Sequence, residues 1–323
     1  MPLLISHEDV HASVTMADAI EAMEDAFRQQ GEGQVIQPPR TNIRVGGGFL
    51  RVGPAVLQGS GWMGFKAMNL SPGVGVRYVV MLYSVATGEL VAIMDAQHLT
   101  TLRTGATSAV ATRRLAHQEP TDVAVIGAGP EAWAQLEAMH ALGLVRTARI
   151  HSRTPANRER FAEEAAKAFD LPATSFATAR EAIDGCGIIV AAVKSNETVL
   201  YGEWLAAGVH VNSVGTARPD QREVDAETFA RSAVVVVDTR EGVFGEAGDA
   251  IAAKDVIAPE GVHELADLVI GKAQGRTDGQ QITLFKSVGT ALQDVGLAAR
   301  IYERARERGI GQEIADFPFV KPA

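Results

Sequence analysis

Hydrophobic residues recur at helical spacing in some parts of this chain and at strand spacing in others. In segment 15–28 they repeat every three to four positions, which predicts an amphipathic helix capped by Thr15 and Asp18 and ended by Gly31. The segments that follow are short, β-like and punctuated by glycine, and one pattern predicts a hairpin, "RYVVMLYS-VATG-ELVAIMDA". A helical repeat then covers "HLTTLRTGATSAVATRRLA". The first third is therefore predicted to be a helix laid on a largely antiparallel sheet.

Beyond the proline of "HQEPT", continuous Val/Ile-rich runs alternate with helical segments. Runs of this kind are typical of parallel strands covered on both faces, so the fold class is α/β, with a Rossmann-type doubly wound parallel sheet and a separate α+β domain. A long amphipathic helix near the C-terminus has no strand after it to pair with the parallel sheet, and we expect it to return to the first domain. The expected domains are 1–116 with 290–323, and 117–289.

Composition and charge narrow the class of protein. A chain of 323 residues exceeds what one core usually organises, which supports two domains. The net charge of −9 works against binding to nucleic acid or anionic membranes. We find neither a signal-peptide pattern nor an apolar run of about 18 residues, so we expect a cytoplasmic protein without a membrane partner. The only cysteine, Cys186, is expected in the core, and no histidine is assigned to a metal.

The segment "VAVIGAGPEA" has a G-x-G-x-x-A pattern after a strand and at the start of a helix. Gly127 allows the tight turn, Gly129 lets the backbone approach a pyrophosphate, and Ala132 lets helix and strand pack closely. Because strand, helix and second strand follow in the right order, the pattern predicts a dinucleotide site. The cofactor contacts expected around this loop and on the third and fourth strands of the domain are Gly127, Gly129, Pro130, Glu131, Ala132, Val193 and Val214.

The second strand of this domain ends in "HSRTPAN", without the acid that would hold the ribose of NAD. Ser152, Arg153 and Thr154 instead offer donors and a cation to a 2′-phosphate. We therefore expect NADP(H) to be preferred, with NAD(H) possible. The alternative is that Arg153 is a solvated surface charge.

Three cations of the first domain fall in apolar or strand-like surroundings, namely Arg40, Lys66 and Arg103. Each taken alone is typical of a surface charge, but an anionic substrate would explain all three. Arginine matches a carboxylate, and a desolvated lysine can transfer protons near neutral pH.

Segments along nearly the whole chain, among them "GELVAIMDAQHLTTLRTGATSAVAT", "NSVGTARPDQRE" and "FKSVG", resemble the ornithine cyclodeaminase/mu-crystallin family. The resemblance implies a homodimer formed through a substrate-binding first domain, NAD(P) bound by the second domain, and small α-imino or α-amino acid substrates. It also implies that Arg40, Lys66 and Arg103 grip the carboxylate and handle protons, and that Arg218 is a further substrate contact. The cofactor contacts that it implies are Thr104, Ser152, Arg153, Thr154 and Asn157.

One departure separates this chain from the cyclodeaminases. They carry an Asp two residues after the glycine equivalent to Gly215, where this chain has Ala217; "ARPD" instead resembles the ketimine reductase and pyrroline-carboxylate reductase branch. We expect NADPH-dependent reduction of Δ1-pyrroline-2-carboxylate or Δ1-piperideine-2-carboxylate to proline or pipecolate. The alternatives are an alanine-type amino-acid dehydrogenase, an ornithine cyclodeaminase, and a non-catalytic protein that binds NADPH and a small ligand.

Overall fold

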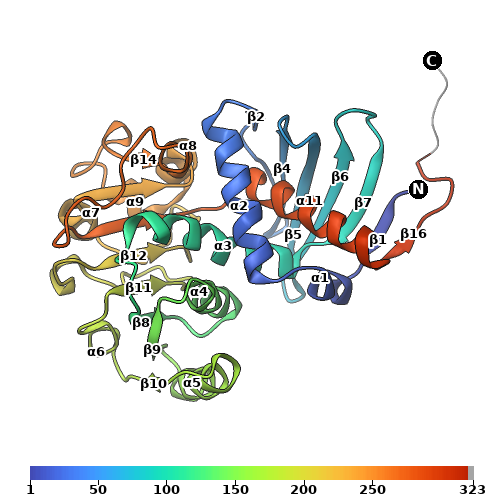
Figure 1. Ribbon diagram of the computed structural model, residues 1–323. Coiled ribbons are helices and arrows are strands. Elements are labelled where there is room, and N and C mark those ends of the chain that lie inside the picture. The colour runs from blue at the N-terminus through green and yellow to red at the C-terminus, as the bar shows by residue number, and fades with distance from the viewer. Residues whose placement is uncertain (319–323) are drawn as a thin grey trace. The chain divides into compact units, whose positions relative to one another are not determined.

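A computed structural model describes residues 1–318 (Figure 1), and residues 319–323 of the expected first domain lie outside the described part. The chain divides into two compact units. Unit 1 holds Met1–Arg103 and the chain from Thr290 onward, and unit 2 holds Thr104–Gly289. Within residues 1–318, no helix is both long and apolar enough to cross a membrane.

Unit 1 contains a mixed, mainly antiparallel sheet. Its strands follow the order β16-β1-β7-β6-β5-β4-β2, with β3 paired to β4, and every pair except β1–β7 is antiparallel. The strands are β1 (Leu3–Ile5), β2 (Val35–Ile36), β3 (Thr41–Val45), β4 (Gly48–Leu57), β5 (Trp62–Ser71), β6 (Gly75–Ser84), β7 (Leu90–Asp95) and β16 (Gln312–Glu313). The predicted hairpin corresponds to β6 and β7 and is confirmed.

Helices cover one face of this sheet (Figure 1). They are α1 (His7–Ser13), α2 (Met16–Gly31) and α11 (Ala291–Arg308), and α11 packs against α2, β4, β5 and β6. The predicted capping box of α2 is present, with Thr15 and Asp18 each bonding the other's backbone N–H. Exposed apolar side chains of β3, β4 and β6 remain elsewhere on the sheet: Ile43, Val45, Leu50, Val76 and Val79.

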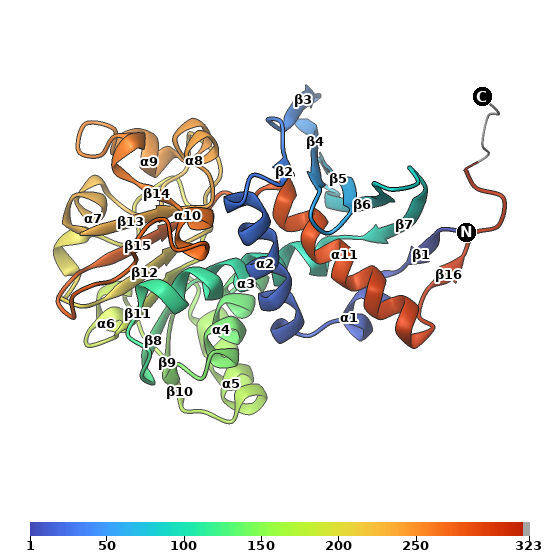
Figure 2. The same cartoon turned by 45° about the horizontal axis from the view of Figure 1, so that its top comes forward.

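Unit 2 is built on a parallel sheet, which confirms the predicted doubly wound fold. The strand order is β10-β9-β8-β11-β12-β15-β13-β14, and all pairs are parallel (Figure 2). The order reverses at β8, so the crevice beyond the carboxyl end of β8 is the expected ligand position. The strands are β8 (Thr121–Ile126), β9 (Val145–His151), β10 (Ala173–Ser175), β11 (Ile188–Ala191), β12 (His210–Ser213), β13 (Val234–Val237), β14 (His263–Glu264) and β15 (Thr283–Lys286).

Helices connect the strands of unit 2. They are α4 (Pro130–Ala141), α5 (Pro155–Phe169), α6 (Ala179–Ile183), α7 (Ala226–Arg231), α8 (Arg240–Glu246), α9 (Gly248–Ala252) and α10 (Leu265–Val269), with 3-10 turns at Gly202–Trp204 and Pro259–Gly261. Helix α3 (Gln97–Leu115) begins in unit 1 and ends in unit 2. Cys186 is buried among the apolar residues between sheet and helices, as expected.

Strand β15 was not expected from the sequence. This strand lies between β12 and β13 in the sheet, although it follows β13 by more than forty residues of chain. The strand has only four residues, and the hydrophobic pattern of so short a segment does not distinguish a strand from the start of the helix that follows.

Candidate functional site

Lys66 lies in the middle of β5, where its side chain is almost buried. Its Nζ donates to Asp294 Oδ1 at 2.7 Å and to Thr100 Oγ1 at 3.3 Å. Only 11% of the Lys66 side chain and 5% of the Asp294 side chain are exposed. Since α11 packs on β5, the first turn of that helix brings the carboxylate to the lysine.

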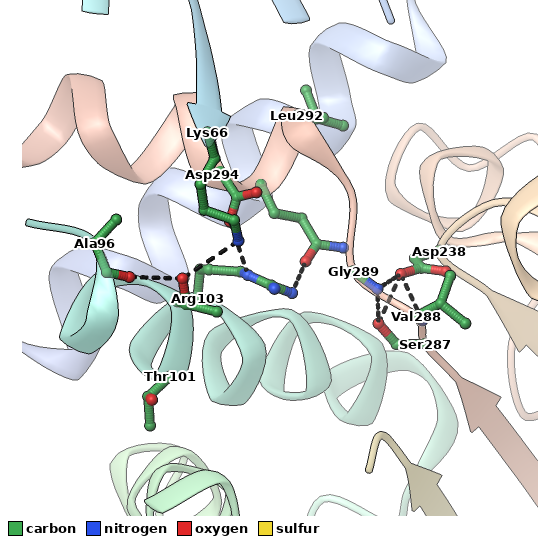
Figure 3. Close-up of polar contacts among 12 residues, drawn as sticks. Lys66, Ala96, Thr101, Arg103, Asp238, Ser287, Val288, Gly289, Leu292 and Asp294 are labelled. Atoms are coloured by element: carbon green, nitrogen blue, oxygen red, sulfur yellow. Dashed lines mark hydrogen bonds and ion pairs between the residues drawn. The ribbon is translucent and has the colours of Figure 1, made fainter. Parts of the chain in front are cut away.

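Arg103, on α3, meets the same carboxylate (Figure 3). Its Nε donates to Asp294 Oδ1 at 3.1 Å, and its Nη1 donates to Gln293 Oε1 at 2.7 Å. One oxygen of Asp294 therefore accepts from both Lys66 and Arg103. This arrangement neutralises part of the buried positive charge within unit 1.

Arg40 is the third cation of the cluster and lies just before β3. A Cβ built on Gly53 would come within 3.6 Å of Arg40 Cβ, and Gly53 is the register partner of Lys66 on β4. Arg40 is also close enough for its charge to lower the pKa of Lys66. The three cations that the sequence singled out in the first domain thus come together.

The surroundings change the acidity of the lysine. Burial lowers the pKa of Lys66 to about 8, Asp294 acts in the opposite direction, and the charges of Arg103 and Arg40 lower it further. An ammonium with this pKa is mostly protonated at neutral pH and can give up its proton readily. The cluster can therefore bind a carboxylate and donate a proton beside it.

Arg218 differs from the other three candidates. It belongs to unit 2, is exposed, and forms a two-pronged ion pair with Asp220 at 2.8 and 3.0 Å. An exposed pair of this kind contributes little to stability.

The glycine loop has the geometry that a dinucleotide requires. Gly127 has a φ of +134°, and a Cβ there would lie 2.7 Å from the carbonyl oxygen of Ala192 and 3.3 Å from Ala132 Cβ. Gly129 is the N-cap of α4 and has open space around its Cβ position. The helix begins with Pro130 and carries Glu131 in its first turn. A backbone that approaches a ligand closely at a helix N-terminus fits a pyrophosphate.

The end of β9 leads directly into α5, whose N-cap is Thr154. The first turn of α5 has no acidic residue. Arg153 and Asn157 are exposed, and the Ser152 hydroxyl donates to the Thr154 carbonyl at 3.2 Å. A cation, hydroxyl groups and a helix N-terminus together fit a phosphate group.

The remaining candidate cofactor contacts also belong to unit 2. Thr104 is buried, and its carbonyl accepts from Gln135 Nε2 at 3.1 Å. Val193 and Val214 follow β11 and β12; the N–H of Val214 donates to the Ala191 carbonyl at 3.0 Å. Both loops leave the carboxyl edge of the sheet; β11 is next to β8, which precedes the glycine loop, and β12 is one strand further along.

Asp294 was not among the site residues expected from the sequence. It lies in the buried first turn of α11, beside Gln293 and among apolar residues such as Leu292 and Val295, so the pattern does contain one signal: a carboxylate at a core position. Two buried cations also require an anion. The pairing itself joins residues 228 positions apart in the chain and could not be read from local sequence.

The chain is similar to known proteins along nearly its whole length. Residues 2–309 match the family model described as "Ornithine cyclodeaminase/mu-crystallin family". A Δ1-pyrroline-2-carboxylate reductase of Bacillus cereus is 32% identical over 97% of this chain and 99% of the relative.

Two solved structures are close neighbours. That of the Thermococcus litoralis Δ1-pyrroline-2-carboxylate reductase in complex with NADH and L-proline has a TM-score of 0.92 at 36% identity, covering 97% of this chain and all of the other. That of an archaeal alanine dehydrogenase dimer with bound NAD has a TM-score of 0.91 at 31% identity, covering 98% of this chain and 99% of the other.

Proposed function

The chain belongs to the ornithine cyclodeaminase/mu-crystallin family, and we propose that it is an NAD(P)H-dependent reductase of small α-imino acids. The substrates that we propose are Δ1-pyrroline-2-carboxylate and Δ1-piperideine-2-carboxylate, which would yield proline and pipecolate. The observation that carries this proposal is the buried cation cluster of unit 1, in which Lys66 and Arg103 share Asp294.

In this proposal, different residues of unit 1 bind the substrate and protonate it. Arg40 and Arg103 hold the substrate carboxylate and so fix the position of the C=N carbon. The bound dinucleotide supplies the hydride that this carbon accepts. Lys66 donates the proton that the nitrogen gains, so that one hydride and one proton convert the imine to an amine.

The residues of unit 2 would hold the dinucleotide. The glycine loop and the start of α4 take the pyrophosphate, and Ser152, Arg153, Thr154 and Asn157 take the 2′-phosphate of NADP. Arg153 and the acid-free first turn of α5 support a preference for NADPH, whereas the two structural neighbours were solved with NADH and with NAD. Titration of the protein with NADPH and with NADH tests the preference; equal affinities would contradict it.

We also propose a homodimer formed through unit 1. The exposed apolar side chains of β3, β4 and β6 offer a surface that a second copy could cover, and one structural neighbour is described as a dimer. Sedimentation equilibrium tests this, and a monomer at micromolar concentration would contradict it.

The decisive experiment follows NADPH absorbance after mixing the protein with each cyclic imine, and with pyruvate plus ammonia or methylamine in parallel. Rapid oxidation with a cyclic imine establishes the reductase and its preferred ring size. Oxidation only with pyruvate and amine would refute it in favour of an amino-acid dehydrogenase. That second candidate rests on the similarity to the archaeal alanine dehydrogenase.

A cyclodeaminase is less well supported because Ala217 provides no carboxylate for a substrate amine. A storage protein that only binds NADPH has no need of a buried lysine poised to give up a proton. The absence of oxidation with every substrate, together with tight NADPH binding, would favour one of these two alternatives.

A further inference from the structure

A buried ionic network lies at the carboxyl ends of β11, β12 and β15 in unit 2. Lys286, the last residue of β15, is completely buried. Its ammonium donates to Ser213 Oγ at 3.0 Å, to Thr216 Oγ1 at 2.9 Å and to Asp249 Oδ2 at 2.8 Å. Glu223, equally buried, places its Oε2 3.6 Å from the same ammonium.

Glu223 uses both of its oxygens to hold two loops. Its Oε1 accepts from the backbone N–H of Val193 at 2.7 Å, and its Oε2 accepts from the N–H of Gly215 at 2.8 Å and from Ser213 Oγ at 2.8 Å. Burial raises the pKa of Glu223 to about 7, while the Lys286 ammonium and the bonds from Val193 and Ser213 favour the ionised form. The ionised carboxylate can accept from all three donors that converge on it. The loop after β11 is thereby tied to the loop after β12.

The two loops approach each other so closely that only glycine fits at position 215. A Cβ on Gly215 would lie 2.3 Å from both Glu223 Oε1 and the backbone nitrogen of Val193. The loop after β11 also lies against the glycine loop: a Cβ on Gly127 would be 2.7 Å from the carbonyl oxygen of Ala192. Contacts therefore run from the glycine loop through Ala192 and Val193 to Glu223 and Gly215.

Apolar side chains could fill this part of the core without the energetic cost of burying charged groups. Removing a lysine and two carboxylates from water costs several kcal/mol per ion, and apolar side chains of similar volume are often as stabilising. What the ions provide here, and apolar groups could not, is a set of directed bonds to two loop N–H groups. We infer that Glu223, supported by Lys286 and Asp249, is a positioning residue that fixes Val193 and Gly215 where the nicotinamide half of the cofactor binds.

The strand order indicates which half of the cofactor lies near the loops that Glu223 holds. A dinucleotide binds across the point where the order reverses, here at β8. The candidate 2′-phosphate contacts follow β9 on one side of β8, so the adenosine half belongs there. The loops after β11 and β12 lie on the other side of β8, so we place the nicotinamide half there.

This inference depends on the proposed dinucleotide binding, and Glu223→Gln tests it. The amide NH2 of glutamine replaces one acceptor oxygen and faces a donor, so one of the two loops is released. We expect the Kd for NADPH to rise by about tenfold or more, while the Kd for 2′-phospho-ADP-ribose, which lacks nicotinamide, changes by less than about twofold. Fluorescence and calorimetric titrations of the purified protein measure both.

Asp238→Asn is the matched control. Asp238 is equally buried in unit 2, and its Oδ2 accepts from the N–H groups of Val288 and Gly289 and from Ser287 Oγ (Figure 3). We expect this variant to lose thermal stability without selective loss of NADPH affinity. If Glu223→Gln does not fold, Ser213→Ala removes one donor to Glu223 and one acceptor of Lys286 but leaves the bonds to the N–H groups of Val193 and Gly215 in place. We expect it to shift the two affinities in the same unequal way, by a smaller factor.

Three outcomes would contradict these proposals, and they distinguish failure of the inference about Glu223 from failure of the proposed dinucleotide binding. Equal weakening of NADPH and 2′-phospho-ADP-ribose by Glu223→Gln would show a general structural role and overturn the inference. Unchanged affinity for both would overturn it as well. If the wild-type protein binds neither compound, the proposed dinucleotide binding fails first.

Discussion

Replacing Asp294 with asparagine should move the pH dependence of catalysis to lower pH. The carboxylate lies 2.7 Å from Lys66 Nζ in a buried position and raises the pKa of that lysine against the effect of burial. Once the negative charge is gone, burial and the charges of Arg103 and Arg40 act unopposed. The pKa of Lys66 therefore falls in Asp294→Asn.

The size of the effect can be bounded from the geometry. At an effective dielectric constant of about 20, two unit charges separated by the observed 2.7 Å interact by about 6 kcal/mol, a ceiling of roughly four pH units. Relaxation and water offset part of this, and an opposite charge at close range typically shifts a pKa by about 1–3 units. For a shift of about two units, the protonated fraction at pH 8 falls from about one half to about one in a hundred.

The assay is kcat with saturating cyclic imine and NADPH across the range from acid to alkaline pH. For the wild type, we expect activity to decline as pH rises through about 8, the pKa of Lys66. For Asp294→Asn, the decline should occur about 1–3 pH units lower, with kcat about fiftyfold reduced near pH 8 and recovering toward acid pH.

Thr100→Val is the control, because it removes a neutral hydrogen bond to Lys66 without removing a charge. We expect its midpoint to move by less than about half a pH unit. Two results for Asp294→Asn would refute the effect of this carboxylate on the pKa of Lys66. One is a pH profile with the wild-type midpoint, and the other is a loss of kcat by the same factor at every pH.

Three further predictions concern single side chains. Lys66→Ala should abolish measurable turnover while leaving the Kd for NADPH within about twofold, because the lysine acts on the substrate; parallel loss of both would contradict its role. Arg153→Ala should weaken NADPH by about tenfold and leave NADH unchanged in fluorescence titration, and equal changes would mean that Arg153 is only a surface charge. Cys186 should resist thiol reagents at pH 8 until the protein is denatured, because burial raises the pKa of its thiol to about 12; rapid labelling of the native protein would count against this.

Local sequence predicted the elements whose pattern is long or whose turn chemistry is distinctive. The apolar repeat and the Thr15 cap located α2, and the alternation of Val/Ile runs with helices indicated the parallel sheet. The glycine loop was recognisable because its residues, spacing and flanking elements all had to agree. These features depend on interactions between residues close together in the chain.

The features that sequence missed depend on distant partners. The sequence marks Asp294 only as a carboxylate at a core position of a helix and does not identify its partner Lys66, and Glu223 gives no sign of its buried surroundings. Strand β15 is too short for its period to be read, and only its neighbours β12 and β13 define it as a strand. Lys66, Arg40 and Arg103 were singled out because buried cations need a partner, but their partner could not be named.

The position of β15 also sets the order in which unit 2 can be completed during synthesis. The ribosome releases β8 to β13 before the strand that separates β12 from β13, so the nascent sheet presents two unpaired edges until residue 286 has emerged. Until then, Glu223 and Asp249 lack the ammonium that accompanies them in the finished core. The last strand of unit 2 to be synthesised thus supplies both the backbone pairing that β12 and β13 lack and the positive charge that accompanies Glu223 and Asp249.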